Sequence, residues 1–140
     1  MKNKFQTRSL ALAIIENGDK ILAKKFFDDH KKETFYRVPG GGIEFRETSR
    51  DALRREMMEE FNAKIKNLKF LQVIENIFTY QGKGRHEIVF LYRADFVYKN
   101  FYNKEELIIM DDPTETFMNW FDKKELLKGN FYPEGVKDFV

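Results

Sequence analysis

The sequence has 140 residues, of which 42% are hydrophobic and 34% charged, and its formal net charge is +2. This length is enough for one domain with a hydrophobic core, so we expect a single domain over residues 1–140. The small net charge argues against a partner such as duplex DNA. The absence of Cys excludes disulfides, thiolate metal sites and a cysteine nucleophile, and it fits a cytoplasmic protein. No segment is long and apolar enough to predict contact with a membrane interior.

The first third of the chain alternates apolar runs with turn-forming residues. The apolar run at 10–15 and the segment 20–25 flank an Asn-Gly pair at 17–18, which predicts a β-hairpin between the two segments. The polar residues 28–33 predict a loop. Residues 34–38 predict a short strand, because a proline and three glycines follow them.

A helix is predicted over residues 49–61. Thr48 is a suitable N-cap, and Asp51 stands at the position of the reciprocal capping partner. Asn62 can adopt the left-handed conformation that ends a helix. Apolar residues at every fourth position predict the stripe that faces the core: Leu53, Met57 and Phe61.

The second half of the chain predicts further strands and a short helix. Residues 70–80 and 87–98 are rich in β-branched and aromatic side chains, and the turn at 81–85 between them predicts an antiparallel pair. Residues 114–120 predict another strand, and a capping box at 122–125 predicts a short helix after it. Several strands with two or three helices indicate an α/β or α+β sandwich around a mixed sheet.

Three carboxylates share one face of the predicted helix. Glu56, Glu59 and Glu60 are spaced i, i+3 and i+4, so their side chains crowd together and repel one another. A divalent cation relieves this repulsion, and carboxylate oxygens favour magnesium, manganese or calcium. A solvated acidic face is the commoner explanation of such spacing when it occurs alone.

The glycines ahead of this helix favour the metal-site interpretation. Gly40, Gly41 and Gly42 permit backbone conformations closed to other residues, and a glycine-rich turn into a helix N-terminus offers N–H groups to phosphate oxygens. We therefore expect these glycines to bind substrate. Arg37 precedes them and can reach a phosphate, although strand alternation leaves an orientation toward solvent open.

The segment from Gly41 to Ala63 resembles the Nudix box, whose pattern is Gly-x5-Glu-x7-Arg-Glu-U-x-Glu-Glu-x-Gly-U, with U a bulky aliphatic residue. The matching positions are Gly41, Glu47, Arg55, Glu56, Met57, Glu59 and Glu60. Asn62 replaces the late glycine, and Ala63 stands at the last aliphatic position. Every charged position of the pattern is kept.

The resemblance implies a Nudix-type α/β/α sandwich and the hydrolysis of a nucleoside diphosphate linked to another moiety, with Mg²⁺ or Mn²⁺. It implies that Glu56, Glu59 and Glu60 bind the metal and act in catalysis, with Glu56 the usual residue that orients or deprotonates water. It also implies that Arg55 and Glu47 form a salt bridge that supports the glutamates.

Candidates outside the box carry weaker signals. Family members often take a further acid from elsewhere, and Glu87 is our candidate for it, with a solvated carboxylate at a strand edge as the alternative. Aromatic residues at 35–36, 78 and 80 are more typical of a core than of base stacking. Lys83 and Arg85 could reach a phosphate as Arg37 could, but turn residues are commonly charged for solubility. Asp111 and Asp112 could form a second acidic site, but a loop ahead of Pro113 is the favoured explanation.

The substrate and the assembly state stay open at this level. A small-molecule nucleotide is the expected partner, and ADP-ribose, nucleoside triphosphates, dinucleoside polyphosphates and sugar nucleotides are all compatible with the box. A homodimer is compatible as well, because many family members dimerise. The rival hypothesis is a non-catalytic nucleotide-binding or regulatory module of the same fold. An isoprenoid-diphosphate isomerase would need a cysteine that this chain lacks.

Overall fold

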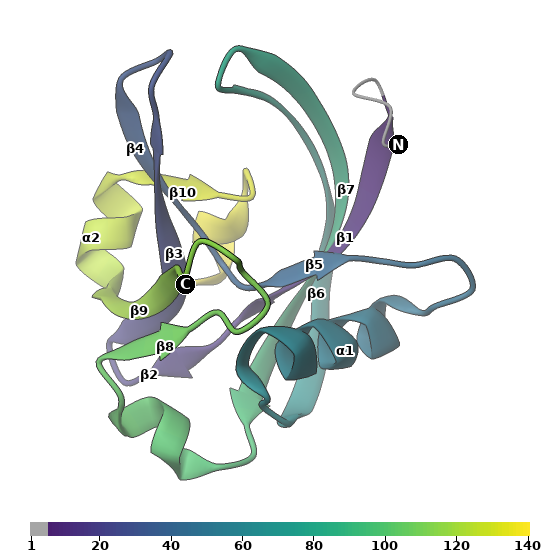
Figure 1. Ribbon diagram of the computed structural model, residues 1–140, viewed down its shortest axis with the longest axis vertical. Coiled ribbons are helices and arrows are strands. Elements are labelled where there is room, and N and C mark those ends of the chain that lie inside the picture. Colours follow the sequence, from purple (N-terminus) through teal and green to yellow (C-terminus); the bar gives the residue numbers. More distant parts are fainter. Residues whose placement is uncertain (1–5) are drawn as a thin grey trace.

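The computed structural model describes residues 6–140, and most of its strands belong to two sheets (Figure 1). The first sheet has the strand order β5-β1-β7-β6. Its members are β1 (Thr7–Ile14), β5 (Gly40–Gly42), β6 (Ile65–Tyr80) and β7 (Lys83–Phe96). Strands β1 and β7 run parallel, whereas β5 and β6 join them in antiparallel fashion.

The second sheet has the order β10-β4-β3-β9-β8, with the two-residue β2 paired to β3. Its strands are β2 (Glu16–Asn17), β3 (Lys20–Asp28), β4 (Glu33–Arg37), β8 (Glu106–Ile108), β9 (Phe117–Asp122) and β10 (Asn130–Tyr132). The helices are α1 (Ser49–Phe61), α2 (Lys123–Lys128) and two 3₁₀ turns, η1 (Lys99–Asn103) and η2 (Val136–Phe139). The predicted mixed α+β architecture is confirmed, with strands divided between two sheets. Within residues 6–140, no helix has the length and apolar character needed to cross a bilayer.

Helix α1 forms where its local sequence predicts it. The Thr48 hydroxyl accepts a hydrogen bond from the Asp51 backbone N–H at 3.1 Å, and Asn62 ends the helix with φ of 52°. Leu53 and Met57 are fully buried and Phe61 nearly so. The apolar stripe therefore attaches α1 to the core and leaves its carboxylate face for other contacts.

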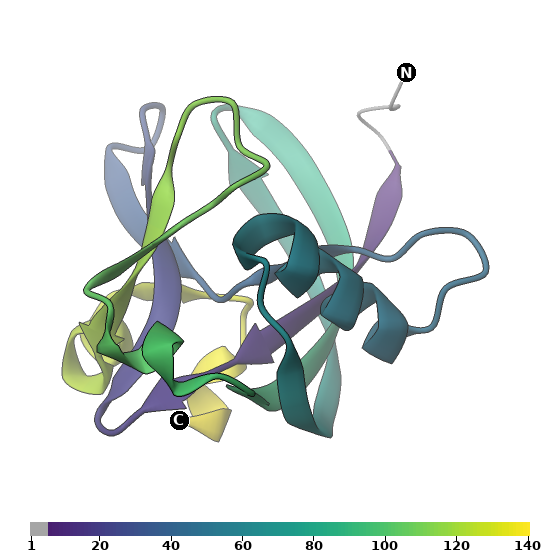
Figure 2. The same ribbon diagram turned by 60° about the horizontal axis from the view of Figure 1, so that its bottom comes forward.

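Two hydrophobic clusters hold the layers together. The first contains the stripe of α1 with residues of β1, β7, β8 and β9, and it fixes the helix beside the first sheet (Figure 2). The second contains inward side chains of both sheets with residues of α2 and η2. Inward side chains alternate along β1, so Leu10, Leu12 and Ile14 belong to the second cluster, whereas Ala11 and Ala13 belong to the first.

Three details differ from the sequence predictions. The chain turns after β2, but β1 leaves this hairpin and pairs with β5 and β7 instead of β3. The glycines form strand β5 opposite β1, and residues 43–48 separate them from α1, so they are not a turn directly into the helix. Asp122 precedes α2 without a side-chain capping bond. In the first two cases long-range strand pairing decides the outcome, although the local turn at Asn17-Gly18 still forms.

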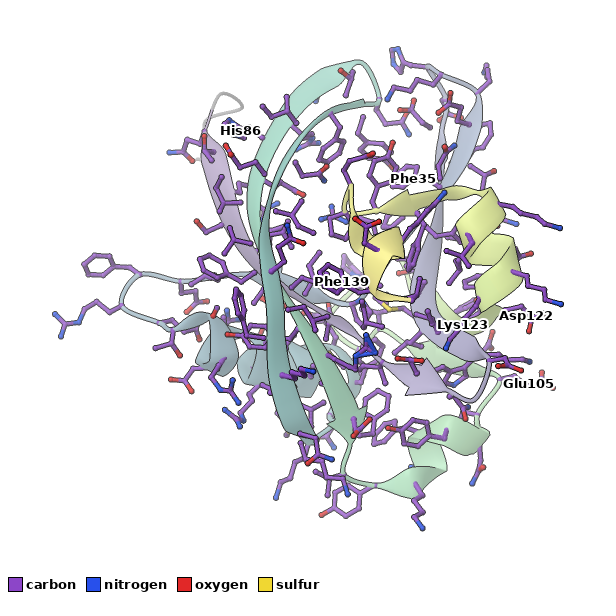
Figure 3. The ribbon with its side chains drawn as sticks, turned by 180° about the vertical axis from the view of Figure 1, so that it is seen from behind. Phe35, His86, Glu105, Asp122, Lys123 and Phe139 are labelled. Carbon is purple, nitrogen blue, oxygen red and sulfur yellow. The ribbon has the colours of Figure 1, made fainter. Side chains whose placement is uncertain are left out.

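Two long hairpins, β3–β4 and β6–β7, extend away from α1 and flank the space between the sheets (Figure 1). Phe35 on β4 and His86 on β7 mark the two hairpins in the view from behind (Figure 3). Their tips are joined because Asp28 accepts a hydrogen bond from the Gln81 backbone N–H at 3.2 Å. The turn between β6 and β7 is tighter than predicted, since β7 already begins at Lys83.

Candidate active site

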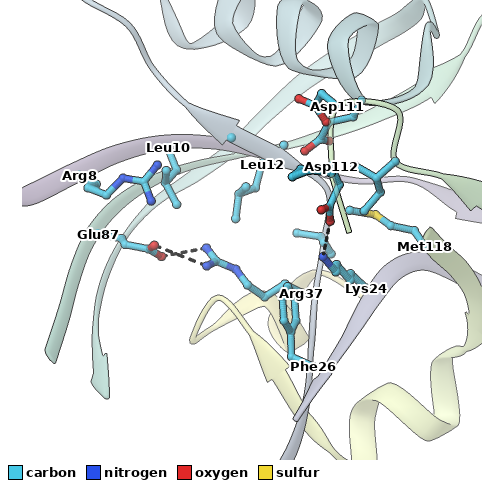
Figure 4. A pocket seen from close by; sticks show the side chains of 16 residues that line it. Arg8, Leu10, Leu12, Lys24, Phe26, Arg37, Glu87, Asp111, Asp112 and Met118 are labelled. Atoms are coloured by element: carbon cyan, nitrogen blue, oxygen red, sulfur yellow. Dashed lines mark hydrogen bonds and ion pairs between the residues drawn. The ribbon is translucent and has the colours of Figure 1, made fainter. Parts of the chain in front are cut away.

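A pocket of about 410 Å³ lies between the two sheets and reaches the C-terminal part of α1. Leu10 and Leu12 of β1 form part of its floor, and Glu60 of α1 lines one end. Figure 4 shows Asp111 on the helix side of this pocket, with Arg8 and Glu87 together at the opposite end. The pocket therefore joins the predicted carboxylate face to side chains from both sheets.

Arg55 connects the predicted site residues to one another. Its guanidinium donates to both carboxylate oxygens of Glu47, at 2.7 Å and 2.9 Å. It also donates to Glu56 at 3.0 Å, to Glu59 at 3.1 Å and to the Gly42 carbonyl at 2.8 Å. The predicted Arg55–Glu47 salt bridge is present, and it ties α1 to both the preceding loop and β5. A planar guanidinium suits this role because its fixed donors can serve several acceptors at once.

The carboxylates of this network have different electrostatic environments. The paired hydrogen bonds from Arg55 lower the pKa of Glu47 to about 2. Burial raises the pKa of Glu56 above its usual value, against the opposing effect of Arg55. Burial, together with the negative charges of Glu56 and Asp111, raises the pKa of Glu60 to about 8. Burial and like charges thus disfavour the ionised forms of Glu56 and Glu60, and a bound cation would reverse that effect.

Glycine is required in β5 by close packing. A Cβ atom on Gly41 would lie 2.4 Å from the Glu56 carboxylate carbon, so the carboxylate occupies the space that any side chain would take. A Cβ on Gly40 would lie 2.1 Å from the Ala11 carbonyl oxygen, and its φ is +136°. These glycines permit β5 to approach both β1 and α1. Whether they also bind substrate stays a prediction.

The loop between β8 and β9 brings a further acid to the site. The Met110 backbone N–H donates to the Glu60 carbonyl at 2.7 Å, which places Asp111 beside the end of α1. Asp112 accepts hydrogen bonds from Thr114 and Thr116, which hold the pKa of its carboxyl below the usual range. It also lies 3.5 Å from the Lys24 ammonium. The loop is therefore anchored to the second sheet, which the sequence did not indicate.

Glu87 is not the exposed strand-edge carboxylate that we considered as an alternative. It lies within β7, is 4% exposed, and pairs with Arg37 across the pocket at 2.8 Å (Figure 4). Arg37 therefore points into the pocket and not to solvent, and its charge is shared with a buried carboxylate. A catalytic role for Glu87 and a substrate-binding role for Arg37 remain predictions.

Two charged pocket residues were missed by reasoning on the sequence: Arg8 and Lys24. Lys24 follows the buried Ala23, so a period-2 pattern could place it on a face. Arg8, in contrast, lies between the exposed Thr7 and Ser9 and carries no such signal. Which face borders the pocket depends on how the two sheets pack. Of the four candidate rings, Tyr36 belongs to the core, whereas Phe35, Phe78 and Tyr80 line a smaller cavity beside the pocket.

The predicted metal ligands adjoin one another without converging. Glu56 and Glu59 both turn to Arg55, and among residues 6–140 no three His, Asp or Glu side chains form a metal-binding cluster. The residues nevertheless fit a divalent cation. Within the described part of the chain, Glu60 Oε2 is buried without a hydrogen-bond partner, and its neighbours supply the oxygen donors that magnesium and manganese prefer.

Comparison with known proteins agrees with this arrangement. The NUDIX domain family matches residues 6–138. A MutT NUDIX hydrolase structure from Burkholderia pseudomallei has a TM-score of 0.63 at 21% identity, covering 96% of this chain and 95% of that one. A NUDIX-family hydrolase from Clostridium perfringens has a TM-score of 0.60 at 18% identity, covering 91% and 90%. A MutT protein from Bacillus halodurans has a TM-score of 0.60 at 20% identity, covering 94% and 78%.

Proposed function

Because this chain belongs to the NUDIX family and is a hydrolase acting on pyrophosphate bonds, we propose that it cleaves a nucleoside diphosphate linked to another moiety. The observation that carries the proposal is the orphaned Glu60 oxygen, buried beside Glu56 and Asp111 at one end of the pocket. A buried carboxylate oxygen without a hydrogen-bond donor would be stabilised by a cation, and such a cation would in turn bind a diphosphate in the pocket.

Glu56, Glu59 and Glu60 would hold Mg²⁺ or Mn²⁺, and Asp111 joins them as an acid from outside the box. When bound, the cation supplies Lewis-acid polarisation of the phosphoanhydride. The resemblance assigns to Glu56 the orientation or the deprotonation of the attacking water. Water then forms the new P–O bond as the bridging P–O bond breaks, and both products leave as phosphates.

Arg55 acts as a positioning residue. Its hydrogen bonds to Glu47 and the Gly42 carbonyl fix the guanidinium, and the remaining N–H groups orient Glu56 and Glu59. Such outer contacts commonly change metal affinity or activity by about 10–100-fold when they are lost. In this proposal Asp111, and not Glu87, is the additional acid at the metal, because Glu87 is paired with Arg37 at the other end of the pocket.

The remaining features of the proposal concern the setting of the reaction. We place a single domain over residues 1–140, a small nucleotide as substrate and the cytoplasm as location, the last on the lack of cysteine. We propose neither duplex nucleic acid nor membrane as a partner. A homodimer is a separate question that sedimentation at several concentrations would answer.

The test is phosphate release from a nucleotide panel with Mg²⁺, comparing the natural chain with Glu59→Gln and Glu60→Gln. Glu75→Gln is the matched control, because Glu75 is an exposed glutamate on β6 away from the pocket. Turnover of at least one member that collapses in the two helix variants and persists in the control supports the proposal. No turnover with Mg²⁺ or Mn²⁺, accompanied by nucleotide-induced thermal stabilisation, would favour the binding-module alternative.

A further inference from the structure

A second chamber of about 200 Å³ adjoins the active-site pocket on the side away from α1. The two share four lining residues: Arg8, Phe26, Arg37 and Glu87. The chamber adds Arg85 from β7 and aromatic rings from both hairpins. Because the lining is shared, one ligand can occupy the pocket and the chamber together.

Positive charge exceeds negative charge in this chamber. Its lining holds three arginines, Arg8, Arg37 and Arg85, against one carboxylate, Glu87. Glu87 is already paired with Arg37 at 2.8 Å. Within residues 6–140, Arg8 and Arg85 have neither a salt bridge nor a hydrogen bond from their side chains, although Arg8 stands opposite Glu87 in the β1–β7 register. Two guanidinium groups are therefore available to an anion, and guanidinium geometry suits phosphate.

The combined cavity is consequently bipolar. Glu60 and Asp111 make the α1 end acidic, and Lys24 offsets them only in part because it also pairs with Asp112 at 3.5 Å. Arg8 lies at the far end (Figure 4). One wall of the chamber is aromatic: Phe26 stacks on Phe35 with centroids 5.0 Å apart, and Tyr80 contacts Phe35 edge-on at 5.4 Å.

We propose that Arg8 and Arg85 form a distal anion subsite, so that the substrate is a nucleotide carrying a second phosphate group remote from the diphosphate that is cleaved. The inference rests on the proposed function, because it assumes that the diphosphate occupies the acidic end. The aromatic wall would then support the nucleoside between two anionic groups. Substrates that lack the second phosphate would leave both guanidinium groups unsatisfied.

The test uses binding, so it does not depend on turnover. The 5′-monophosphates and 3′,5′-bisphosphates of adenosine and guanosine serve as probes in calorimetric titrations of the full chain with Mg²⁺. We expect at least one bisphosphate to bind about tenfold or more tightly than its monophosphate, which corresponds to about 1.4 kcal/mol. The advantage should fall below about twofold in Arg8→Gln and Arg85→Gln, while monophosphate binding stays nearly unchanged.

Lys83→Gln is the matched control, because Lys83 is a cation on the same strand, two residues from Arg85, and does not line the chamber. Arg85→Lys, which keeps the charge, should retain part of the advantage. Four results would overturn the proposal. They are equal affinity for mono- and bisphosphates, a bisphosphate preference that survives both arginine variants, an equal loss of that preference in Lys83→Gln, and no binding of either bisphosphate. Hydrolysis of a nucleotide, with no preference for bisphosphates in the binding assay, would refute the distal subsite but not the proposed reaction. A bisphosphate preference without any hydrolysis would refute the proposed reaction but not the subsite.

Discussion

The buried pair of Arg37 and Glu87 offers a quantitative test of how the pocket is held together. Replacing Arg37 with Met removes the guanidinium 2.8 Å from a carboxylate whose side chain is 5% exposed. At about 4 Å between charge centres and an effective dielectric constant of about 20, the lost attraction is roughly 4 kcal/mol. Breaking a buried pair by removing one partner costs about 3–5 kcal/mol. Because the Arg37 side chain is 21% exposed, we expect the lower end, about 3 kcal/mol.

The assay is urea unfolding at neutral pH, supported by thermal melting, where a loss of this size lowers Tm by about 10 °C. Glu87→Gln should cost less, about 1 kcal/mol, because the amide oxygen still accepts from Arg37. The double variant Arg37→Met/Glu87→Leu should return to within about 1 kcal/mol of the natural chain, since no charge is then left unpaired. Costs that simply add in the double variant, or an Arg37→Met loss below about 1 kcal/mol, would refute the pairing.

Three further outcomes follow from the geometry of the site. Gly41→Ala should displace the Glu56 carboxylate and lower kcat by about 10–100-fold. Gly84→Ala is the control and should retain activity, because a Cβ added at Gly84 meets nothing within 4 Å. Equal kinetics in the two variants would contradict the packing argument. Arg55→Lys keeps the charge but loses the planar fork, so Mn²⁺ affinity measured by calorimetry should fall about tenfold or more, and unchanged affinity would exclude the positioning role. Burial opposes ionisation of Asp28, but backbone N–H donors outweigh it and lower the pKa of the Asp28 carboxyl below 3.8. The stability contributed by ionised Asp28 is therefore present above pH 3.8 and lost as pH falls through the pKa of the folded state. The Tm difference between the natural chain and Asp28→Asn should shrink on acidification from neutral pH to about pH 3, and a constant difference would be inconsistent with this linkage.

Helix α1 and its carboxylate face could be predicted from the sequence because their determinants are local. The Thr48 cap, the left-handed Asn62 and the buried stripe all lie within a few residues of the helix. The spacing of Arg55 and Glu47 likewise indicated the salt bridge, through the resemblance to the Nudix box. These features depend on helical periodicity and turn chemistry, which neighbouring residues largely determine.

Strand partners could not be predicted in the same way. The Asn-Gly turn forms, yet β1 pairs with β7, more than seventy residues away in the register, for example Thr7 with His86. The glycines look like a phosphate turn in sequence, and they serve in the structure as a strand that passes close to Glu56. Strand pairing depends on which distant segments of the chain pack together. A local sequence signal can therefore identify a strand without identifying the strand it pairs with.

The amino-acid sequence by itself determined the helix and the shared face of its three glutamates, because spacing along a helix fixes which side chains share a face. Their support by Arg55 was implied by the resemblance to the Nudix box. Only the tertiary structure decided that Asp111 lies beside the end of α1, where the Met110 backbone N–H donates to the Glu60 carbonyl. It also decided that Glu87 is buried against Arg37, and that Arg8 and Arg85 line one chamber. Strand alternation assigns such residues to a face, but the packing of one sheet against another decides whether that face meets water, core or substrate.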